Sequence, residues 1–192
     1  MKIKFESGLS YQQEAINAIV DIFQGQEVCT SNFTVFSPEY LAKQKTLDFN
    51  QKGYANKLQL TEAQILENTQ KIQLRNGMKP SLPNEVDIRH LDFSVEMETG
   101  TGKTYVYLRT IMEMNRQYGF TKFIIVVPSI PIKEGVYKSL QITESHFKEH
   151  YNNIPYKYFI YDSSNLSDVR DFAVNDQLQI MVINIDAFRK KL

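Results

Sequence analysis

The sequence predicts an α/β fold with a parallel sheet, and three observations support this prediction. Short apolar runs, "KFIIVV", "YKYFIY" and "LQIMVINI", alternate with amphipathic stretches of helical length from residue 92 onward. The run "FIIVV" is apolar throughout, as is typical of strands that are covered on both faces. A glycine-rich turn separates the first predicted strand of this series from its first helix. Strands that alternate with helices imply right-handed crossovers and therefore parallel pairing.

One helix is predicted in the N-terminal part, residues 1–25, and sequence signals mark both of its ends. Ser10 and Gln13 have the spacing of a capping box, in which each side chain bonds the other residue's backbone N–H. Gly25 is the predicted C-terminal stop, because glycine adopts the left-handed conformation that ends many helices.

Residues 26–91 are interpreted as an insertion ahead of the glycine-rich turn. The stretch 26–60 lacks a clear period and is rich in Asn, Gln, Lys and Ser, so we expect it to be irregular with a few short elements. A second helix is predicted at 61–77, where Thr61 and Gln64 have capping-box spacing and an Asn-Gly pair marks the stop.

The third part, residues 92–192, predicts the sheet and its covering helices. The strands are expected at 92–97, 122–127, 156–161 and 178–185. The helices are expected at 104–119, where Gly119 closes the helix, within 131–151, and at 166–175.

Composition limits the class of protein. The 192 residues suit one domain, or one domain with an insertion, and 42% of them are hydrophobic, which is enough for a packed core. Lys+Arg and Asp+Glu are both 22, so any contact with nucleic acid must come from a local patch. The chain has neither a signal-peptide pattern nor an apolar run of about 20 residues, so we expect a soluble cytoplasmic protein without a membrane partner. Cys29 is the only cysteine, which fits a reducing compartment.

A phosphate-binding loop is predicted at residues 97–104, "METGTGKT". Gly100 and Gly102 let the backbone curl so that its N–H groups face phosphate oxygens, and the following helix adds the positive end of its dipole. Met97 stands where the strict G-x-x-x-x-G-K-[ST] pattern has its first glycine. The alternative is a Gly/Thr turn that merely starts a helix, but the order strand, loop, helix favours a nucleotide site.

Within this loop, Lys103 and Thr104 are the predicted catalytic residues. The Lys103 ammonium can reach the β- and γ-phosphates, and the Thr104 hydroxyl can ligate Mg²⁺ that arrives with ATP. The backbone of Thr99, Gly100, Thr101 and Gly102 completes the predicted cofactor-binding set.

Two aspartates are candidates for the second, water-mediated Mg²⁺ contact. Asp162 and Asp186 each end an apolar run, but neither is followed by the Glu that a helicase-type site uses to activate water. The simpler interpretation, which we favour, is that Asp162 is a turn residue and Asp186 a helix N-cap. On this interpretation the hydrolytic half of the site is absent from these 192 residues.

The stretch "EMETGTGKTYVYLRTIMEMNRQYGFTKFIIVVPSIPIKEGVYKSL" closely resembles the motor (restriction) subunit of type III restriction-modification enzymes. These are superfamily-two helicases with two RecA-like domains. In that family the loop reads M-E-T-G-T-G-K-T, so Met97 is expected there. "FIIVVPSIPIKEGV" resembles the motif that contacts the DNA backbone, "QIMVINIDAF" the strand before the Asp-Glu motif, and "YQQEAI" the adenine-reading glutamine motif. The resemblance is loose over residues 26–91.

The resemblance implies a RecA-like phosphate-loop NTPase domain, the first motor domain of an ATP-dependent DNA translocase. It implies ATP and Mg²⁺ as cofactors. The implied partners are double-stranded DNA, a methyltransferase (modification) subunit, and further motor and nuclease domains of the same polypeptide. Because no Asp-Glu box follows residue 186, we expect a fragment that is inactive alone, although the full-length family member is an ATP-dependent endonuclease.

Three more residues are assigned with the help of this resemblance. The Gln12 amide matches the donor–acceptor edge of adenine, although a solvated first-turn glutamine explains it equally well from the helix alone. Ser129 and Lys133 follow the run at 122–127, at the carboxyl edge where α/β proteins bind ligands, and can contact DNA phosphates. A simple cap and a solvated lysine are nearly as good an explanation for this pair.

Other residues support no site. His90, His146 and His150 lack metal-ligand partners at useful spacing, so we predict no structural metal. The basic residues at 189–191 are interpreted as a solvated tail. The alternatives to a restriction motor are another superfamily-two ATPase of defence or repair, a small-molecule phosphate-loop kinase, and a non-catalytic binding module that has lost turnover.

Overall fold

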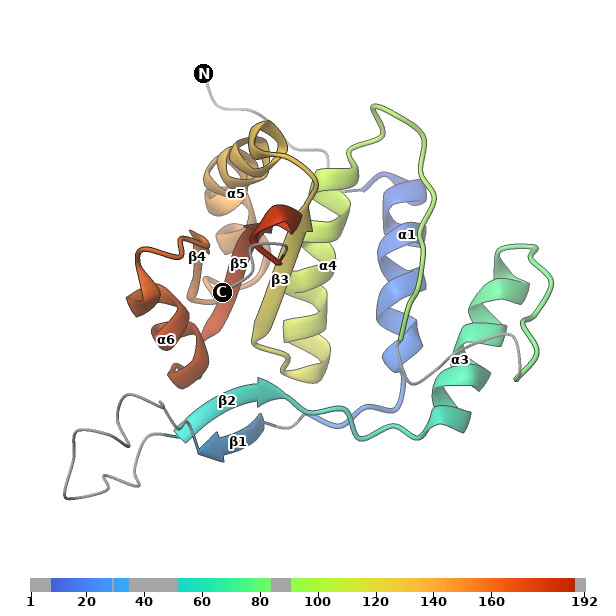
Figure 1. The fold of residues 1–192 in the computed structure, drawn as a ribbon. Coiled ribbons are helices and arrows are strands. Elements are labelled where there is room, and N and C mark those ends of the chain that lie inside the picture. Colours follow the sequence, from blue (N-terminus) through green and yellow to red (C-terminus); the bar gives the residue numbers. More distant parts are fainter. Residues whose placement is uncertain (1–7, 29, 35–51, 84–90, 189–192) are drawn as a thin grey trace. The chain divides into compact units, whose positions relative to one another are not determined.

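The computed structural model describes residues 8–28, 30–34, 52–83 and 91–188 (Figure 1). The chain forms two compact units. The first unit consists of Met1–Val28 and Leu58–Tyr118, and the second of Cys29–Lys57 and Gly119–Leu192. The predicted loop and Gln12 belong to the first unit, whereas Ser129 and Lys133 belong to the second.

Helices build the described part of the first unit. They are α1 (Ser10–Val20), the short 3-10 helix η1 (Asp21–Phe23), α3 (Glu62–Arg75) and α4 (Lys103–Tyr118). α1 packs beside α4, and Ile16 and Leu108 are fully buried there (Figure 1). The Tyr118 hydroxyl donates to the Val20 carbonyl at 2.9 Å, which fixes the end of α4 against the end of α1.

The helix ends confirm most of the predicted signals. Gly25, Gly77 and Gly119 all have positive φ just beyond a helical segment, where glycine is the favoured residue. The capping box of Thr61 and Gln64 is present at the start of α3.

The predicted capping box of Ser10 and Gln13 is wrong. Leu9 is the N-cap residue of α1, and it makes no side-chain cap hydrogen bond. Because the helix begins one residue earlier than predicted, Ser10 lies inside its first turn. Gln13 Nε2 instead donates to Asn17 Oδ1 at 2.8 Å, one turn further along α1.

The second unit contains the predicted parallel sheet. Its strands lie in the order β3 (Lys122–Val127), β5 (Leu178–Asn184) and β4 (Tyr156–Ile160), and β5 pairs in parallel with both neighbours. α5 (Ile130–His150) connects β3 to β4, α6 (Leu166–Val174) connects β4 to β5, and the 3-10 helix η2 (Ile185–Phe188) follows (Figure 1). The prediction of an α/β fold with parallel strands is confirmed.

Two predictions about strands are wrong. Residues 92–97 form no strand. A strand needs a second strand to pair with, and the described residues of the first unit contain no strand. β3 is not covered on both faces either, since Ile124 and Val126 are 51% and 48% exposed. Only β5, the central strand, is buried along nearly its whole length.

A small antiparallel sheet lies within the stretch predicted to be irregular. It pairs β1 (Thr30–Thr34) with β2 (Lys52–Asn56). The Asn56 side chain holds this sheet to the start of β3: its Nδ2 donates to the Lys122 carbonyl at 2.7 Å, and its Oδ1 accepts from the Thr121 N–H at 2.8 Å.

Candidate nucleotide site

The residues 99–102 form a tight turn that leads directly into α4. Gly100 and Gly102 both have φ of +83°, a conformation that costs other residues energy. α4 begins at Lys103, so the first N–H groups of the helix follow the turn and have no acceptor within the helix. Backbone donors at a helix N-terminus, with the positive end of its dipole, suit an anion.

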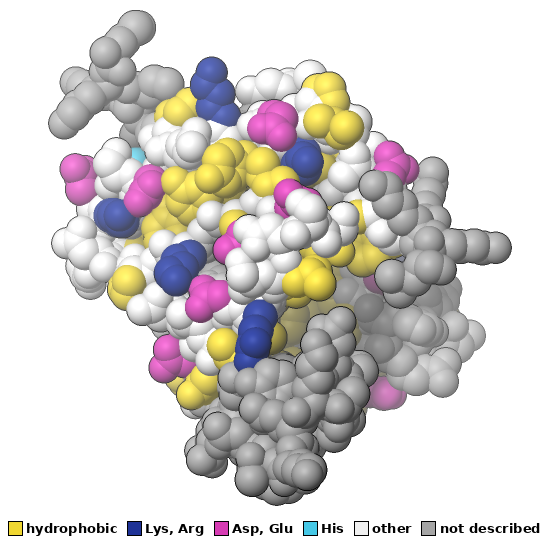
Figure 2. Space-filling model, turned by 60° about the vertical axis from the view of Figure 1, so that its left-hand side comes forward, with side chains coloured by type: hydrophobic (Ala, Val, Ile, Leu, Met, Phe, Trp, Pro, Cys, Tyr) yellow, Lys and Arg dark blue, Asp and Glu magenta, His cyan; other side chains and the backbone are white. Residues whose placement is uncertain are grey.

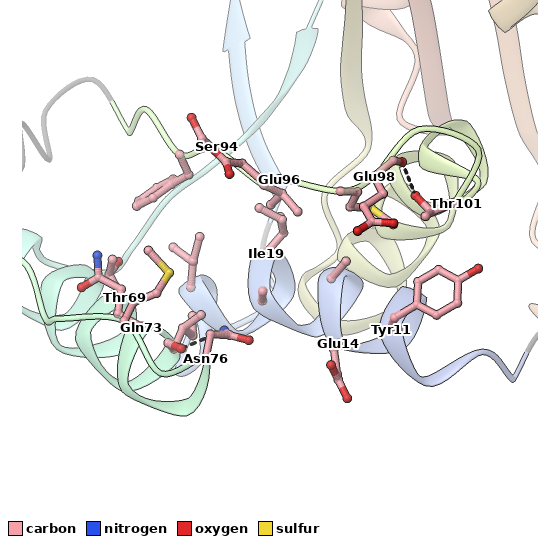
Figure 3. Close-up of a pocket in the computed structure, with 18 of the residues that line it drawn as sticks. Tyr11, Glu14, Ile19, Thr69, Gln73, Asn76, Ser94, Glu96, Glu98 and Thr101 are labelled. Carbon is pink, nitrogen blue, oxygen red and sulfur yellow. Dashed lines mark hydrogen bonds between the residues drawn. The ribbon is translucent and has the colours of Figure 1, made fainter.

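Two hydrogen bonds fix the turn from inside the first unit. The Thr101 hydroxyl donates to the Glu98 carbonyl at 2.7 Å, which closes the turn on itself (Figure 3). Gln12 Nε2, on α1, donates to the Thr101 carbonyl at 2.9 Å. Gln12 is only 6% exposed, so it is not the solvated first-turn residue that was the alternative for it.

The two predicted catalytic residues lie at the start of α4. Lys103 is exposed, so its ammonium is accessible to a ligand. Thr104 is half-buried and is hydrogen-bonded to Tyr107, one turn along the helix. Burial raises the pKa of the Tyr107 hydroxyl, and the bond to Thr104 partly opposes that rise. Tyr107 therefore restrains the hydroxyl that is expected to ligate Mg²⁺.

A cavity of about 1280 Å³ opens beside the turn, between α1, α3 and the extended residues 92–98 (Figure 3). Thr99, Gly100 and Thr101 form part of its lining, and Ile19 contributes to an apolar wall. Its charged lining residues are Glu14, Asp92, Glu96 and Glu98, and the described lining includes no Lys or Arg. Carboxylates disfavour a triphosphate in this cavity, so its interior does not suit phosphate groups.

The predicted DNA-contacting residues lie at the carboxyl end of β3. Ser129 is the N-cap residue of α5 and makes no side-chain cap hydrogen bond, and Lys133 N–H donates to its carbonyl at 3.0 Å. Lys133 is half-buried and lies near enough to Asp162 to lower the pKa of that carboxyl. On the face drawn in Figure 2, Lys and Arg side chains are scattered among Asp and Glu rather than gathered into one patch.

The predicted structural role is present at Asp162, after β4, but not at Asp186, after β5. Asp162 Oδ1 accepts from Ser164 N–H at 2.8 Å and from Ser164 Oγ at 2.7 Å, which confirms the turn interpretation. These bonds, with a smaller contribution from Lys133, lower the pKa of Asp162. The N-cap interpretation of Asp186 is wrong, because Asp186 lies inside η2 and its N–H donates to Asn184 Oδ1 at 2.9 Å.

The remaining candidates are the histidines, Cys29 and the basic residues at 189–191. Within the described ranges, no three His, Cys, Asp or Glu side chains are grouped so that they could hold a metal ion. His146 and His150 stack on α5 with ring centroids 6.0 Å apart. Cys29, His90 and the basic residues at 189–191 lie outside the described residues. No helix in the described part of the chain is long and apolar enough to cross a membrane.

The sequence is similar to one family of proteins over nearly its whole length. The profile of the family described as "Type III restriction enzyme, res subunit" matches residues 7–192. The Type III restriction-modification enzyme EcoPI Res subunit of Escherichia phage P1 is 32% identical over 167 residues, covering 84% of this chain and 15% of that protein. The corresponding EcoP15I Res subunit of Escherichia coli is 31% identical over 163 residues, covering 83% and 15%. The StyLTI Res subunit of Salmonella typhimurium is 45% identical over 64 residues, covering 32% and 6%. The chain thus spans about 15% of the length of the first two relatives.

Proposed function

This chain belongs to the family of type III restriction enzyme Res subunits, and on that premise we propose that it is the ATP-binding part of a DNA-translocating motor. The observation that carries the proposal is the turn at residues 99–102. Its two glycines at positive φ are followed at once by a helix N-terminus, a lysine and a threonine. That arrangement suits the phosphates of a nucleotide. Membership of this family argues against a small-molecule kinase.

Each residue of the turn has a role in this proposal. The backbone N–H groups of residues 99–104 bind the phosphates, and the Lys103 ammonium neutralises charge on them. Mg²⁺, when bound with ATP, neutralises charge that develops on the phosphates, and Thr104 supplies a hydroxyl ligand for it. Gln12 holds the turn through the Thr101 carbonyl, and reading of the adenine edge by its amide Oε1 and remaining N–H is the alternative role for it.

DNA, the modification subunit and cleavage belong to the proposal for the whole protein. Ser129 and Lys133 would contact phosphates of the DNA backbone, which fixes position without reading sequence. Sequence recognition would come from the modification (methyltransferase) subunit, and DNA cutting from a nuclease domain. The relatives' names describe type III restriction-modification enzymes, which is what this partnership requires.

Calorimetric titration of the chain with Mg-ATP, Mg-ADP and Mg-GTP tests the nucleotide site. We expect ATP and ADP to bind, because the β-phosphate reaches the turn in both. The absence of heat with every nucleotide, from a chain shown to be folded by circular dichroism, would reject the proposed function.

The DNA role predicts a uniform effect of Lys133→Ala. This change should weaken duplex binding about two- to fivefold at low salt and to the same extent on unrelated sequences, because one phosphate contact is lost. The slope of log affinity against log salt should fall in magnitude by about 0.9. Fluorescence anisotropy with two labelled duplexes measures both quantities.

Lys138→Ala is the matched control, because Lys138 is an exposed lysine on the same helix. It should leave affinity and salt slope nearly unchanged. A loss limited to one duplex sequence in Lys133→Ala would contradict a backbone contact.

A further inference from the structure

Gln12 is buried for a reason that the base of a nucleotide does not explain. It lies four residues before Ile16 and eight before Val20, on the stripe of α1 that faces inward. A buried amide must be hydrogen-bonded or it costs free energy. Its Nε2 meets that need at the Thr101 carbonyl, 89 residues away in the sequence and 2.9 Å away in space.

The same amide packs against Gly102. A Cβ atom added to Gly102 would lie 2.8 Å from Gln12 Nε2, closer than such atoms approach in proteins. A Cβ atom added to Gly100, which has the same φ, would meet nothing within 4 Å. Gln12 therefore contacts one particular peptide of the turn, the one that joins Thr101 to Gly102.

The hydrogen bond from Gln12 to the Thr101 carbonyl also fixes the direction of the Gly102 N–H, which can donate a hydrogen bond to a phosphate. A peptide bond is planar and trans, so the Thr101 carbonyl and the Gly102 N–H point in opposite directions. While Gln12 holds the carbonyl, the Gly102 N–H must point away from α1. The Thr101 hydroxyl donates to the Glu98 carbonyl at 2.7 Å, and this second hydrogen bond also restrains Thr101 against rotation of its peptide with Gly102.

We propose that Gln12 is a positioning residue that keeps the Thr101–Gly102 peptide from flipping and so directs the Gly102 N–H toward the phosphates. The role rests on the proposed nucleotide site and is independent of the base. Its consequence differs from that of adenine reading: loss of Gln12 weakens the binding of every polyphosphate, including one that carries no base.

The test uses Gln12→Met in the full chain, because methionine has nearly the same length and no donor. Calorimetry with Mg-ATP, Mg-GTP and inorganic tripolyphosphate should show a common loss of about three- to tenfold, the effect of one hydrogen bond. The Gly102 amide resonance in ¹⁵N–¹H spectra should shift or broaden. Gln12→Leu, which is uncharged and also lacks a donor, should give the same loss and provides a second variant if methionine disturbs folding.

Gln13→Met is the matched control. Gln13 is the next residue of α1, but its amide bonds Asn17 on the same helix, so all three affinities and the Gly102 resonance should stay as in the wild type. A loss for ATP with unchanged tripolyphosphate binding would overturn the proposal in favour of base reading, and unchanged affinities would overturn it outright. A wild-type chain that bound none of the three ligands would instead reject the proposed function.

Discussion

Replacing Lys103 by alanine is expected to weaken Mg-ATP binding at least about tenfold, which corresponds to ~1.4 kcal/mol. Lys103 is the first residue of α4 and is exposed, so its loss disturbs no core packing. Its ammonium is expected to contact the β- and γ-phosphates, where charge is greatest. Calorimetry with Mg-ATP and Mg-ADP measures the change, and adenosine, which has no phosphate, should show no difference between the wild type and the variant.

Lys71→Ala provides the control for this prediction. Lys71 is an exposed lysine of the same unit, on α3, and pairs with Glu67 at 2.7 Å. It should leave ATP affinity within about twofold, because exposed pairs contribute little. Equal ATP affinity in the wild type and Lys103→Ala would mean that the turn is structural and binds no phosphate.

Local sequence signals predicted local structure well. The glycines after α3 and α4 and the capping box at Thr61 are short-range devices, and all of them lie where the sequence placed them. The first capping box failed because α1 begins one residue earlier than the spacing of Ser10 and Gln13 requires. With Leu9 at the N-cap, the residue three positions later is Gln12, and its amide is used on Thr101 rather than on the helix start.

Features that depend on neighbours in space were predicted less well. Residues 92–97 alternate apolar and polar side chains as a strand does, yet alternation alone supplies no partner for the backbone. β3 and β5 read alike in the sequence, but one lies at the sheet edge and the other in its centre. The pairing of β1 with β2 joins segments on either side of residues 35–51, and no turn signal marks it.

The candidate site likewise has a local part that the sequence predicts and a long-range part that it does not. Its turn, lysine and threonine are contiguous, so the pattern alone finds them. The contact of Gln12 with Thr101 spans most of the chain, and sequence reasoning assigned Gln12 to the base instead. One signal was available: residues 12, 16 and 20 share a helical face, so a glutamine on that face had to find a buried partner.

Gly102→Ala is expected to weaken Mg-ATP binding more than the other changes at this turn, by about fifteenfold or more. Two costs add. A left-handed φ costs alanine ~1–2 kcal/mol, which shifts the turn away from the competent conformation and lowers apparent affinity accordingly. The new Cβ would also lie 2.8 Å from Gln12 Nε2, so the amide must move, and we expect it to give up its bond to Thr101.

Gly100→Ala separates the two costs. Gly100 has the same φ of +83°, but its added Cβ would meet nothing within 4 Å. It should therefore show the loss due to backbone strain alone, about five- to thirtyfold. Calorimetric titration of both variants with Mg-ATP gives the difference, and we expect Gly102→Ala to be weaker than Gly100→Ala by about three- to tenfold.

A double variant decides whether that difference comes from Gln12. In Gly102→Ala combined with Gln12→Ala, the amide that the new Cβ displaces is already absent, so the two losses should not add. The double variant should bind Mg-ATP about as well as Gly102→Ala alone. In Gly100→Ala combined with Gln12→Ala, the strain and the lost hydrogen bond arise at separate groups, and their costs should add more nearly. Equal losses for the two single glycine variants, or full additivity in both double variants, would show that Gln12 and Gly102 act independently in shaping the turn.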